Sequence, residues 1–590
     1  MRKALAINLG LALAVAVDAV YQIGVLPYVA IAYLFAITIL IISGRIQKHI
    51  PIYIFGIALA LLWATSMQGT YVVGTDIHTE LYATNSVIAN GWDVAKTDGN
   101  NSSFTLVLLA PLLDKLGFDV VWQFKMLYPL FFAFTPVFLY LAYKTLFGTK
   151  RAYLATIFLI IMPMFVLDMT SHVKGMVSQP FLAAAIFLFV ADMRWRVKLP
   201  LFFVCIVGAS VNHYAVGMWT TIYMVGTFGL VLLVQIKRRV FNHETIKKRA
   251  YILAVGSVAV VSIITMYGWY SVVGGGSFLR YVADIGKNIV EVTGITSQTS
   301  DTELQTQYKL YTSSVVNVNI KTGTYLDNQE QLVKTALGFD FMSATTGGKA
   351  FRIFQYITQL FIVIGVGVIF WRFKKEKIPL VYKSMVFISI MILFACLFVP
   401  FFTTIGSATR TYQITLYTLA PAFIIGAEQL RIIKWLKGKT LWITTTIILV
   451  YALFTTGFVL EASKSTVTDR VDMPYSVSLS NNRLNIAGIF TPDDVKVAEW
   501  LSYNGDSDVP LYSDYNGTCL MLGLAPWWTV RQTDIPIDKD CYVFLTGWSV
   551  ENDTLVYGGM PGLRISKELP DINMDTLYQK GDAVAMRSSN

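Results

Sequence analysis

The sequence predicts a polytopic α-helical membrane protein with a separate α/β domain at its C-terminus. Of its 590 residues, 55% are hydrophobic and only 14% are charged, whereas charged residues make up about a quarter of an ordinary soluble protein. The apolar residues form runs of about 20, the helix length that crosses a bilayer, and these runs predict about thirteen transmembrane helices. The runs stop near residue 460, and the rest of the chain has the mixed composition of a water-exposed domain.

Basic residues predict the orientation, because Lys and Arg concentrate in the cytoplasmic loops of membrane proteins. The predicted helices cover residues 4–23, 26–43, 51–67, 126–147, 152–169, 177–193, 199–213, 215–235, 250–270, 352–371, 380–400, 411–430 and 440–460. With a cytoplasmic N-terminus, nearly all Lys and Arg residues of the short loops fall inside. An odd number of spans then places the C-terminal domain outside the cell. Since these loops account for the net charge of +10, we expect a lipid bilayer and no nucleic acid as a partner.

We divide the chain into a membrane domain, residues 1–460, and an extracytoplasmic domain, residues 461–590. Two large outer loops interrupt the membrane domain, at 68–125 and 271–351. The first loop contains an apolar stretch at 103–113 that is too short to span a bilayer. Four Asn-x-Ser/Thr sequons all fall in segments placed outside, at Asn100, Asn101, Asn516 and Asn552.

The C-terminal segment carries the signals of a small α/β domain. Thr491 followed by Pro492 is typical of a helix N-terminus, and residues 509–512 read as a strand. Cys519 and Cys541 both lie in this segment. If the domain is extracellular they can form a disulfide, and two buried free thiols are the alternative.

Ionisable residues gather where the predicted helices meet the outer surface. Such residues are costly in lipid and usually functional there, and the helices contain almost none. An ion-coupled transporter needs charges or broken helices near the midplane, and the pattern shows neither. The candidate site residues, in chain order, are Asp76, His78, Glu80, His172, Lys174, His213, Tyr214, Arg410 and Tyr412.

Asp76, His78 and Glu80 alternate directly after the third predicted helix. Asp76 and Glu80 are four residues apart, so that they share one face if the segment is helical. We predict catalytic roles for both carboxylates, and the pair could also hold Mg²⁺ or Mn²⁺. The alternative is that they are solvated loop acids.

This set of groups suits glycosyl transfer from a sugar carried on a polyprenyl phosphate. Asp76 can take the proton of an attacking hydroxyl, and Arg410 and Lys174 can bind the phosphate and stabilise the charge that develops on it. The histidines and tyrosines of the set are expected to contact substrate. For one bound head group we expect roughly 8–15 Å between Asp76 and Arg410. The alternative for Arg410 is an anchor in the lipid head groups.

At these residues the chain resembles the GT-C superfamily of membrane glycosyltransferases, which includes oligosaccharyltransferases, protein O-mannosyltransferases and aminoarabinose transferases. The segments that carry the resemblance are Gly74-Thr75-Asp76-Ile77-His78-Thr79-Glu80, Asn212-His213-Tyr214 and Arg410-Thr411-Tyr412-Gln413-Ile414-Thr415-Leu416. They are similar to a group of archaeal predicted membrane proteins of unassigned substrate. The resemblance implies many helices, a catalytic acid in the first large outer loop at Asp76, and often a soluble outer domain.

The sequence departs from the oligosaccharyltransferases in one respect. Their Trp-Trp-Asp-Tyr-Gly motif is absent, and Trp527-Trp528-Thr529-Val530 is not a version of it. The leading hypothesis is therefore transfer of a sugar to a glycan, lipid or surface-protein acceptor. The alternatives are a polymerase or ligase of lipid-linked glycans, and a non-enzymatic transporter or assembly protein of the cell surface.

Overall fold

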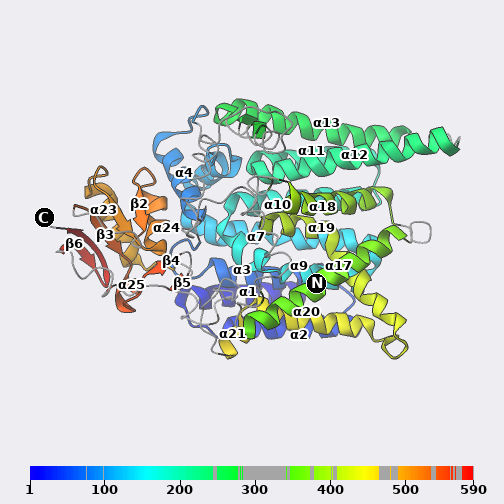
Figure 1. Cartoon of the computed structure of the whole chain (residues 1–590), viewed down its shortest axis with the longest axis horizontal. Coiled ribbons are helices and arrows are strands. Elements are labelled where there is room, and N and C mark those ends of the chain that lie inside the picture. Colours follow the sequence, from blue (N-terminus) through cyan, green and yellow to red (C-terminus); the bar gives the residue numbers. More distant parts are fainter. Residues whose placement is uncertain are drawn as a thin grey trace.

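The computed structural model consists of a long helical bundle with a small mixed domain at one end (Figure 1). It describes residues 1–74, 76–96, 99–242, 249–276, 346–371, 378–399, 408–463, 489–532, 540–557 and 574–588, with a few isolated positions between these ranges. Most of the predicted outer loop 271–351 lies outside the described residues. The helices of the bundle run along the long axis of the molecule, and we call the end that carries the small domain the site end.

Each predicted apolar run corresponds to a helix or to a chain of short helices. The long elements are α1 (Arg2–Tyr21), α2 (Leu26–Ile42), α3 (Ile50–Ser66), α8 (Phe134–Phe147), α9 (Thr149–Ile160), α10 (Val173–Val190), α11 (Trp195–Asn212), α12 (Tyr214–Asn242), α13 (Arg249–Val272), α17 (Thr346–Trp371), α18 (Leu380–Phe398), α19 (Ala408–Ala427) and α20 (Thr440–Thr455). Helices are the expected solution here, because a helix satisfies all of its backbone hydrogen bonds within one segment and lipid offers none.

Eight helices in the described part are long and apolar enough to cross a membrane, and nine if one bent pair is counted as a span. The bent pair joins α9 to the short helices η3 (Met164–Asp168) and η4 (Met169–Ser171) at an angle of 58°. Three further apolar helices, α2, α3 and α20, are shorter than this length. The structure therefore confirms a polytopic helical membrane protein, and the number thirteen stays a prediction.

Helix α19 lies in the middle of the bundle and is buried along most of its length. It packs against α17 at two glycines: a Cβ on Gly365 would lie 1.8 Å from the carbonyl oxygen of Ala422, and one on Gly426 would lie 1.8 Å from that of Phe361. Small residues allow two helix backbones to approach closely in a membrane. This contact holds α19 firmly, and α19 begins with the segment that contains Arg410.

The first loop at the site end is largely helical rather than irregular. It contains α4 (Asp76–Asn90), the π-helix η1 (Thr105–Leu109) and α5 (Ala110–Lys115). The apolar stretch at 103–113 thus forms two short helices, neither long enough to span. A chain of short helices follows, α6 (Val120–Trp122), η2 (Gln123–Leu127) and α7 (Tyr128–Phe132), and together with α8 these form one apolar span over Val120–Phe147.

The C-terminal domain is an α/β unit, as predicted. Its elements are α23 (Pro492–Asn504), β1 (Leu511–Ser513), α24 (Tyr515–Leu524), β2 (Val530–Gln532), β3 (Tyr542–Leu545), α25 (Gly547–Glu551), β4 (Val556–Tyr557), β5 (Met560–Pro561), β6 (Met574–Lys580) and β7 (Ala583–Ser588). The main sheet has the strand order β2-β1-β3-β7-β6, in which β1 pairs in parallel with β2 and β3. Strands β6 and β7 form the antiparallel edge of the sheet.

Two predictions for this domain are settled by the structure. Thr491 caps α23 in a capping box with Asp494, and Pro492 is the first helical residue, as expected. Cys519 and Cys541 are both buried and are not joined by a disulfide.

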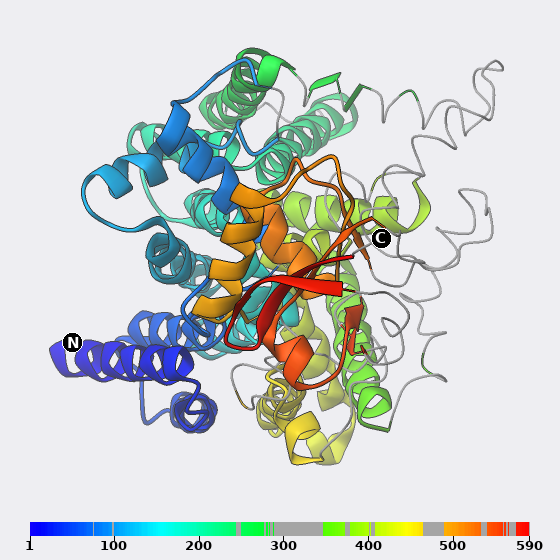
Figure 2. The same ribbon diagram turned by 90° about the vertical axis from the view of Figure 1, so that its left-hand side faces the viewer.

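The C-terminal domain packs on α4, through α24. A Cβ on Gly523 of α24 would lie 3.2 Å from the Cβ of His78, and the Tyr82 ring of α4 lies 5.9 Å from that of Trp527. Figure 2 shows this domain over the middle of the bundle's end face. The C-terminal domain and Asp76 therefore lie at the same end of the bundle, as the sequence predicts.

Candidate active site

Asp76 is placed by the close approach of two connecting segments. The chain leaves α3, and Gly74 adopts a φ of +116°, where a Cβ would lie only 2.3 Å from the Cβ of Ser171. Only glycine allows both this conformation and this contact without strain. The two segments touch at this point, and the first residue of α4, Asp76, comes to lie beside His172.

Asp168 and His172 are placed by the bend after α9. Met164–Ser171 turns by 58° away from the axis of α9, and His172 then adopts an extended conformation immediately before α10. Asp168 and His172 are four residues apart. The bend brings both side chains to the site end of the bundle, where Asp168 is 39% exposed and His172 is buried.

Four side chains from three parts of the chain form a closed arrangement of ion pairs, which we call the charge ring. Asp76 Oδ2 lies 3.1 Å from His172 Nδ1 and 3.0 Å from Arg410 Nη2. Asp168 Oδ2 lies 3.2 Å from His172 Nε2 and 3.4 Å from Arg410 Nε. Each cation therefore bridges the same two carboxylates.

The charge ring is half open to the outside. The Asp76, Asp168 and Arg410 side chains are 47%, 39% and 35% exposed, whereas that of His172 is only 6% exposed. His172 thus forms the floor, and the two carboxylates with the guanidinium form a surface that a substrate can reach. With both cations protonated, the four groups carry no net charge.

The electrostatics of the charge ring favour its charged form. Burial alone would lower the pKa of His172, but Asp168 and Asp76 oppose this and raise it to about 9. Burial likewise acts to raise the pKa of Asp76, and the contacts with His172 and Arg410 hold that pKa well below its usual range. The Asp76 carboxylate is therefore ionised at any physiological pH.

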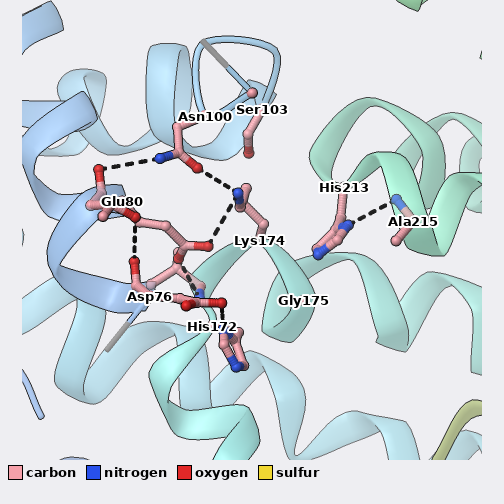
Figure 3. Close-up of polar contacts among 12 residues, drawn as sticks. Asp76, Glu80, Asn100, Ser103, His172, Lys174, Gly175, His213 and Ala215 are labelled. Atoms are coloured by element: carbon pink, nitrogen blue, oxygen red, sulfur yellow. Dashed lines mark hydrogen bonds and ion pairs between the residues drawn. The ribbon is translucent and has the colours of Figure 1, made fainter. Parts of the chain in front are cut away.

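A second ion pair lies one turn further along α4. Glu80 Oε1 lies 3.5 Å from Lys174 Nζ, and Glu80 Oε2 accepts a 2.7 Å hydrogen bond from the backbone N–H of Val173. Lys174 also donates to Asn100 Oδ1 (Figure 3). Burial raises the pKa of Glu80, and Lys174 opposes the shift. The pair joins α4 to the start of α10.

His213 and Tyr214 border this second pair. The Lys174 Nζ atom lies 6.0 Å from the centre of the Tyr214 ring, within the reach of a cation–π interaction. His213 Nδ1 accepts a 3.0 Å hydrogen bond from the backbone N–H of Ala215, which ties the ring to the start of α12 (Figure 3). Tyr412 is half-buried and packs on the core of the bundle.

The structure does not bring His78 into the site, which corrects the prediction that it contacts substrate. Its side chain is fully buried, between the rings of Tyr71 and Phe490 at 5.8 and 5.3 Å. Neither ring nitrogen has a hydrogen-bond partner among the described residues. On a helix His78 points to a different face from Asp76 and Glu80, and here that face meets the C-terminal domain.

Two further findings differ from the sequence-based expectations. Asp76 and Arg410 are in direct contact at 3.0 Å, so the separation of roughly 8–15 Å expected for a bound head group is wrong for this conformation. Asp168 was missed as a site residue, although it is four residues before His172 and is one of the few acids near a predicted helix end. These two signals together could have identified it.

An apolar groove opens on the bundle beside these groups. It has a volume of about 750 Å³, and α10, α11, α13 and the start of η1 provide its walls. Asn212 lines it directly before His213, and Phe181 lines it two turns after Lys174 on α10. Residues that line the groove therefore lie close in the sequence to the residues around the second ion pair.

The charge ring does not fit a resident divalent cation. Its two carboxylates already face two cations, and Glu80 faces Lys174. A bound Mg²⁺ or Mn²⁺ would have to displace Arg410 or His172, since like charges repel at this range. Within the described ranges, no three His, Cys, Asp or Glu side chains form a group that could hold a metal.

Comparisons with known proteins agree with a membrane protein. Residues 340–585 match the model of a family described as predicted membrane protein, DUF2206. A search of the curated proteins gives no match.

A comparison with solved structures gives several distant matches. ArnT from Cupriavidus metallidurans bound to undecaprenyl phosphate is 11% identical, with 90% of this chain and 97% of that chain covered and a TM-score of 0.42. The archaeal oligosaccharyltransferase AglB from Archaeoglobus fulgidus, in complex with an inhibitory peptide and a dolichol-phosphate, is 11% identical, with 81% and 63% covered and a TM-score of 0.45.

A second structure of the Archaeoglobus fulgidus oligosaccharyltransferase, in complex with Zn and sulfate, is 10% identical, with 81% and 61% covered and a TM-score of 0.44. This chain thus spans less than two thirds of the oligosaccharyltransferase. At 10–11% identity and TM-scores of 0.42–0.45, these similarities carry no conclusion about the activity of this chain.

Proposed function

We propose that the chain is a glycosyltransferase that moves a sugar from a polyprenyl-phosphate-linked donor to a glycan, lipid or surface-protein acceptor. The reaction would occur at the non-cytoplasmic face of the membrane, with the N-terminus in the cytoplasm and the C-terminal domain outside. The observation that carries the proposal is the contact between Asp76 and Arg410 at 3.0 Å, in a half-exposed charge ring at the end of a membrane bundle.

The apolar groove suits the lipid part of such a donor. Its walls are almost entirely hydrophobic side chains, so a polyprenyl tail can move from the bilayer into the groove and exchange contacts with lipid for packing against the protein. At the Asn212 end of the groove lie His213 and Lys174. A phosphate at the head of the tail would therefore meet Lys174 first, with Arg410 as the second cation.

Transfer then needs a proton acceptor and a stabilised leaving group. The acceptor hydroxyl attacks the anomeric carbon, and its proton passes to the Asp76 carboxylate. The bond between the anomeric carbon and the phosphate oxygen breaks, and the electron pair leaves with the phosphate. Lys174 and Arg410 stabilise that charge. If Arg410 turns from Asp76 to the phosphate, Asp76 also becomes a stronger base, because one of the charges that lower its pKa is removed.

The test is turnover of a donor by the purified full chain in lipid nanodiscs. We expect free polyprenyl phosphate to be released from at least one member of a panel of polyprenyl-phosphate sugars. Val207→Trp, which fills part of the groove, should raise KM for a long-chain donor and leave KM for a two-isoprene donor unchanged. Leu233→Trp, at a lipid-exposed position of α12, is the matched control.

The absence of donor turnover across the panel, together with no binding of polyprenyl phosphate, would contradict the proposal. Equal effects of Val207→Trp on long and short donors would contradict the assignment of the groove.

A further inference from the structure

Asp76 and Asp168 each use only one of their two carboxylate oxygens inside the charge ring. All four contacts of the ring are made by the Oδ2 atoms. Among the described residues, neither Oδ1 atom has a partner in the protein. An ionised carboxylate accepts hydrogen bonds and donates none. These two carboxylate oxygens can therefore accept hydrogen bonds from a bound substrate.

The two carboxylates are also fixed relative to each other. The His172 ring is a planar group that bridges both of them and lies buried beneath them. It therefore keeps them together even when Arg410 turns to the phosphate. The two Oδ1 atoms therefore act as a pair with a set spacing, rather than as two independent acids.

Two carboxylate oxygens at a fixed spacing discriminate between the classes of molecule to which the proposed reaction could transfer the sugar. A serine or threonine side chain offers one hydroxyl, which leaves one carboxylate oxygen without a donor. A saccharide or another polyol offers neighbouring hydroxyls, which can donate to both. A bound acceptor covers these half-exposed oxygens and displaces water from them. Because a polar group that loses water without gaining a partner is costly, a site of this kind favours the substrate that satisfies both oxygens.

We infer that the acceptor is a polyol, in the first place a saccharide, which presents two neighbouring hydroxyls to the charge ring: Asp76 takes the proton of the reacting hydroxyl and Asp168 holds the other. This inference rests on the proposed function and narrows its acceptor. Asp76 is assigned as the base because it is the more exposed of the two and lies beside Glu80 and Lys174, where the phosphate is expected. Asp168 is then the substrate-orienting residue.

The proposal is tested with Asp168→Asn, which keeps the size of the side chain and removes its charge. With methyl glycosides of common hexoses as acceptors, we expect KM to rise about 10- to 100-fold, the effect of losing one hydrogen bond to a charged group. Hydrolysis of the donor by water needs no second hydroxyl, so Asp168→Asn, which also weakens the hold on His172 and Arg410, should slow hydrolysis much less than it slows transfer. Asp168→Glu should recover part of the loss.

Deoxy analogues of the acceptor separate orientation from a general structural effect. For the wild type, removal of the hydroxyl next to the reacting one should cost as much as Asp168→Asn does. For Asp168→Asn, the deoxy and the parent acceptor should be used equally well. Glycerol and phosphatidylglycerol, whose head group carries two neighbouring hydroxyls, are used as acceptors to decide whether the polyol is a saccharide or a lipid head group.

The outcomes distinguish this inference from the proposed function. If the wild type turns over the donor, and Asp168→Asn slows hydrolysis and transfer equally, the inference is overturned and the proposed function stands. If the wild type uses no donor, binding of the methyl glycosides is measured directly by NMR. Binding that is the same for wild type and Asp168→Asn overturns the inference in that case as well.

Discussion

Arg410 and Asp76 are 334 residues apart in the sequence, and their side chains meet at 3.0 Å. The contact joins the start of the central helix α19 to the start of α4, the helix on which the C-terminal domain packs. A charged pair at the end of a membrane bundle is costly to assemble. Under the proposed function, this pair is part of the surface that binds the substrate.

Replacement of Arg410 should separate charge from geometry. A lysine keeps the charge but is a single point donor, and it cannot bridge Asp76 and Asp168 as a guanidinium does. We expect Arg410→Gln to lower kcat for donor turnover by about 10²–10³-fold, the usual effect of removing a donor that stabilises a developing anion. Arg410→Lys should be intermediate. Turnover in nanodiscs is the measurement.

The control is an arginine that the proposed reaction does not use. Arg151 forms a bidentate pair with Glu428, which belongs to the short helix η8 (Glu428–Ile432) after α19. Arg151→Gln should leave kcat within about twofold of wild type, because this exposed pair is worth about 1 kcal/mol or less. Equal losses in Arg410→Gln and Arg151→Gln would show that only the packing of α19 is being measured.

Because of His172, the protein should lose stability as the pH becomes alkaline. Its pKa is raised to about 9 in the folded state and is about 6.5 in an unfolded chain. The folded state thus binds the proton more tightly, and this contribution is fully present below pH 6.5 and is lost as pH rises to about 9. Thermal unfolding in nanodiscs should show the decline, and His172→Gln should flatten it. A profile of wild type that is already flat contradicts the charge ring.

Gly74 should not tolerate a side chain. Alanine would have to adopt a φ of +116° and place its Cβ 2.3 Å from that of Ser171, at a cost of about 1–3 kcal/mol for the backbone alone. We expect Gly74→Ala to lower both stability and donor turnover, since Asp76 moves away from His172. Ser171→Gly in the same chain should recover part of the turnover. Gly91→Ala is the control, because Gly91 also has a positive φ but no atom within 4 Å of a Cβ.

His78 should make the contact between α4 and the C-terminal domain sensitive to acid. Burial lowers its pKa to about 3, so the unfolded or undocked state binds the proton more tightly. The docked state is stable above pH 6.5 and loses up to about 1.4 kcal/mol per pH unit as pH falls below that value. The protection factor of the α24 amides, which corrects the exchange rate for its intrinsic dependence on pH, should therefore fall in acid for wild type. In His78→Met the fall should be absent, and an unchanged fall would exclude His78 as its cause.

The sequence predicts much of this architecture because lipid imposes a simple rule. Long apolar runs must become helices, and Thr491 with Pro492 marks the helix start that the structure shows. Most charged residues of the site could also be identified from the sequence. Asp76, His172, Lys174 and Arg410 stand out because charged groups are rare at the ends of such runs, and the structure brings all four to one end of the bundle.

The errors arise where the side chain's direction decides the outcome. His78 lies between two site acids in the sequence, but the helical turn of 100° per residue points it at the C-terminal domain. Asp168 lies inside an apolar run, and only the 58° bend after α9 brings it to the surface. The expected distance from Asp76 to Arg410 assumed a ligand between them, and composition says nothing of how two opposite charges arrange themselves without one.

The central claim is that the Asp76 carboxylate takes the proton of the attacking hydroxyl. The most direct measurement is the initial rate of polyprenyl phosphate release by Asp76→Asn and by wild type, at saturating donor and acceptor in nanodiscs. Asparagine keeps the shape and cannot accept the proton, so we expect a loss of at least about 10²-fold, within the usual contribution of general base catalysis. A rate for Asp76→Asn close to that of wild type would contradict the account.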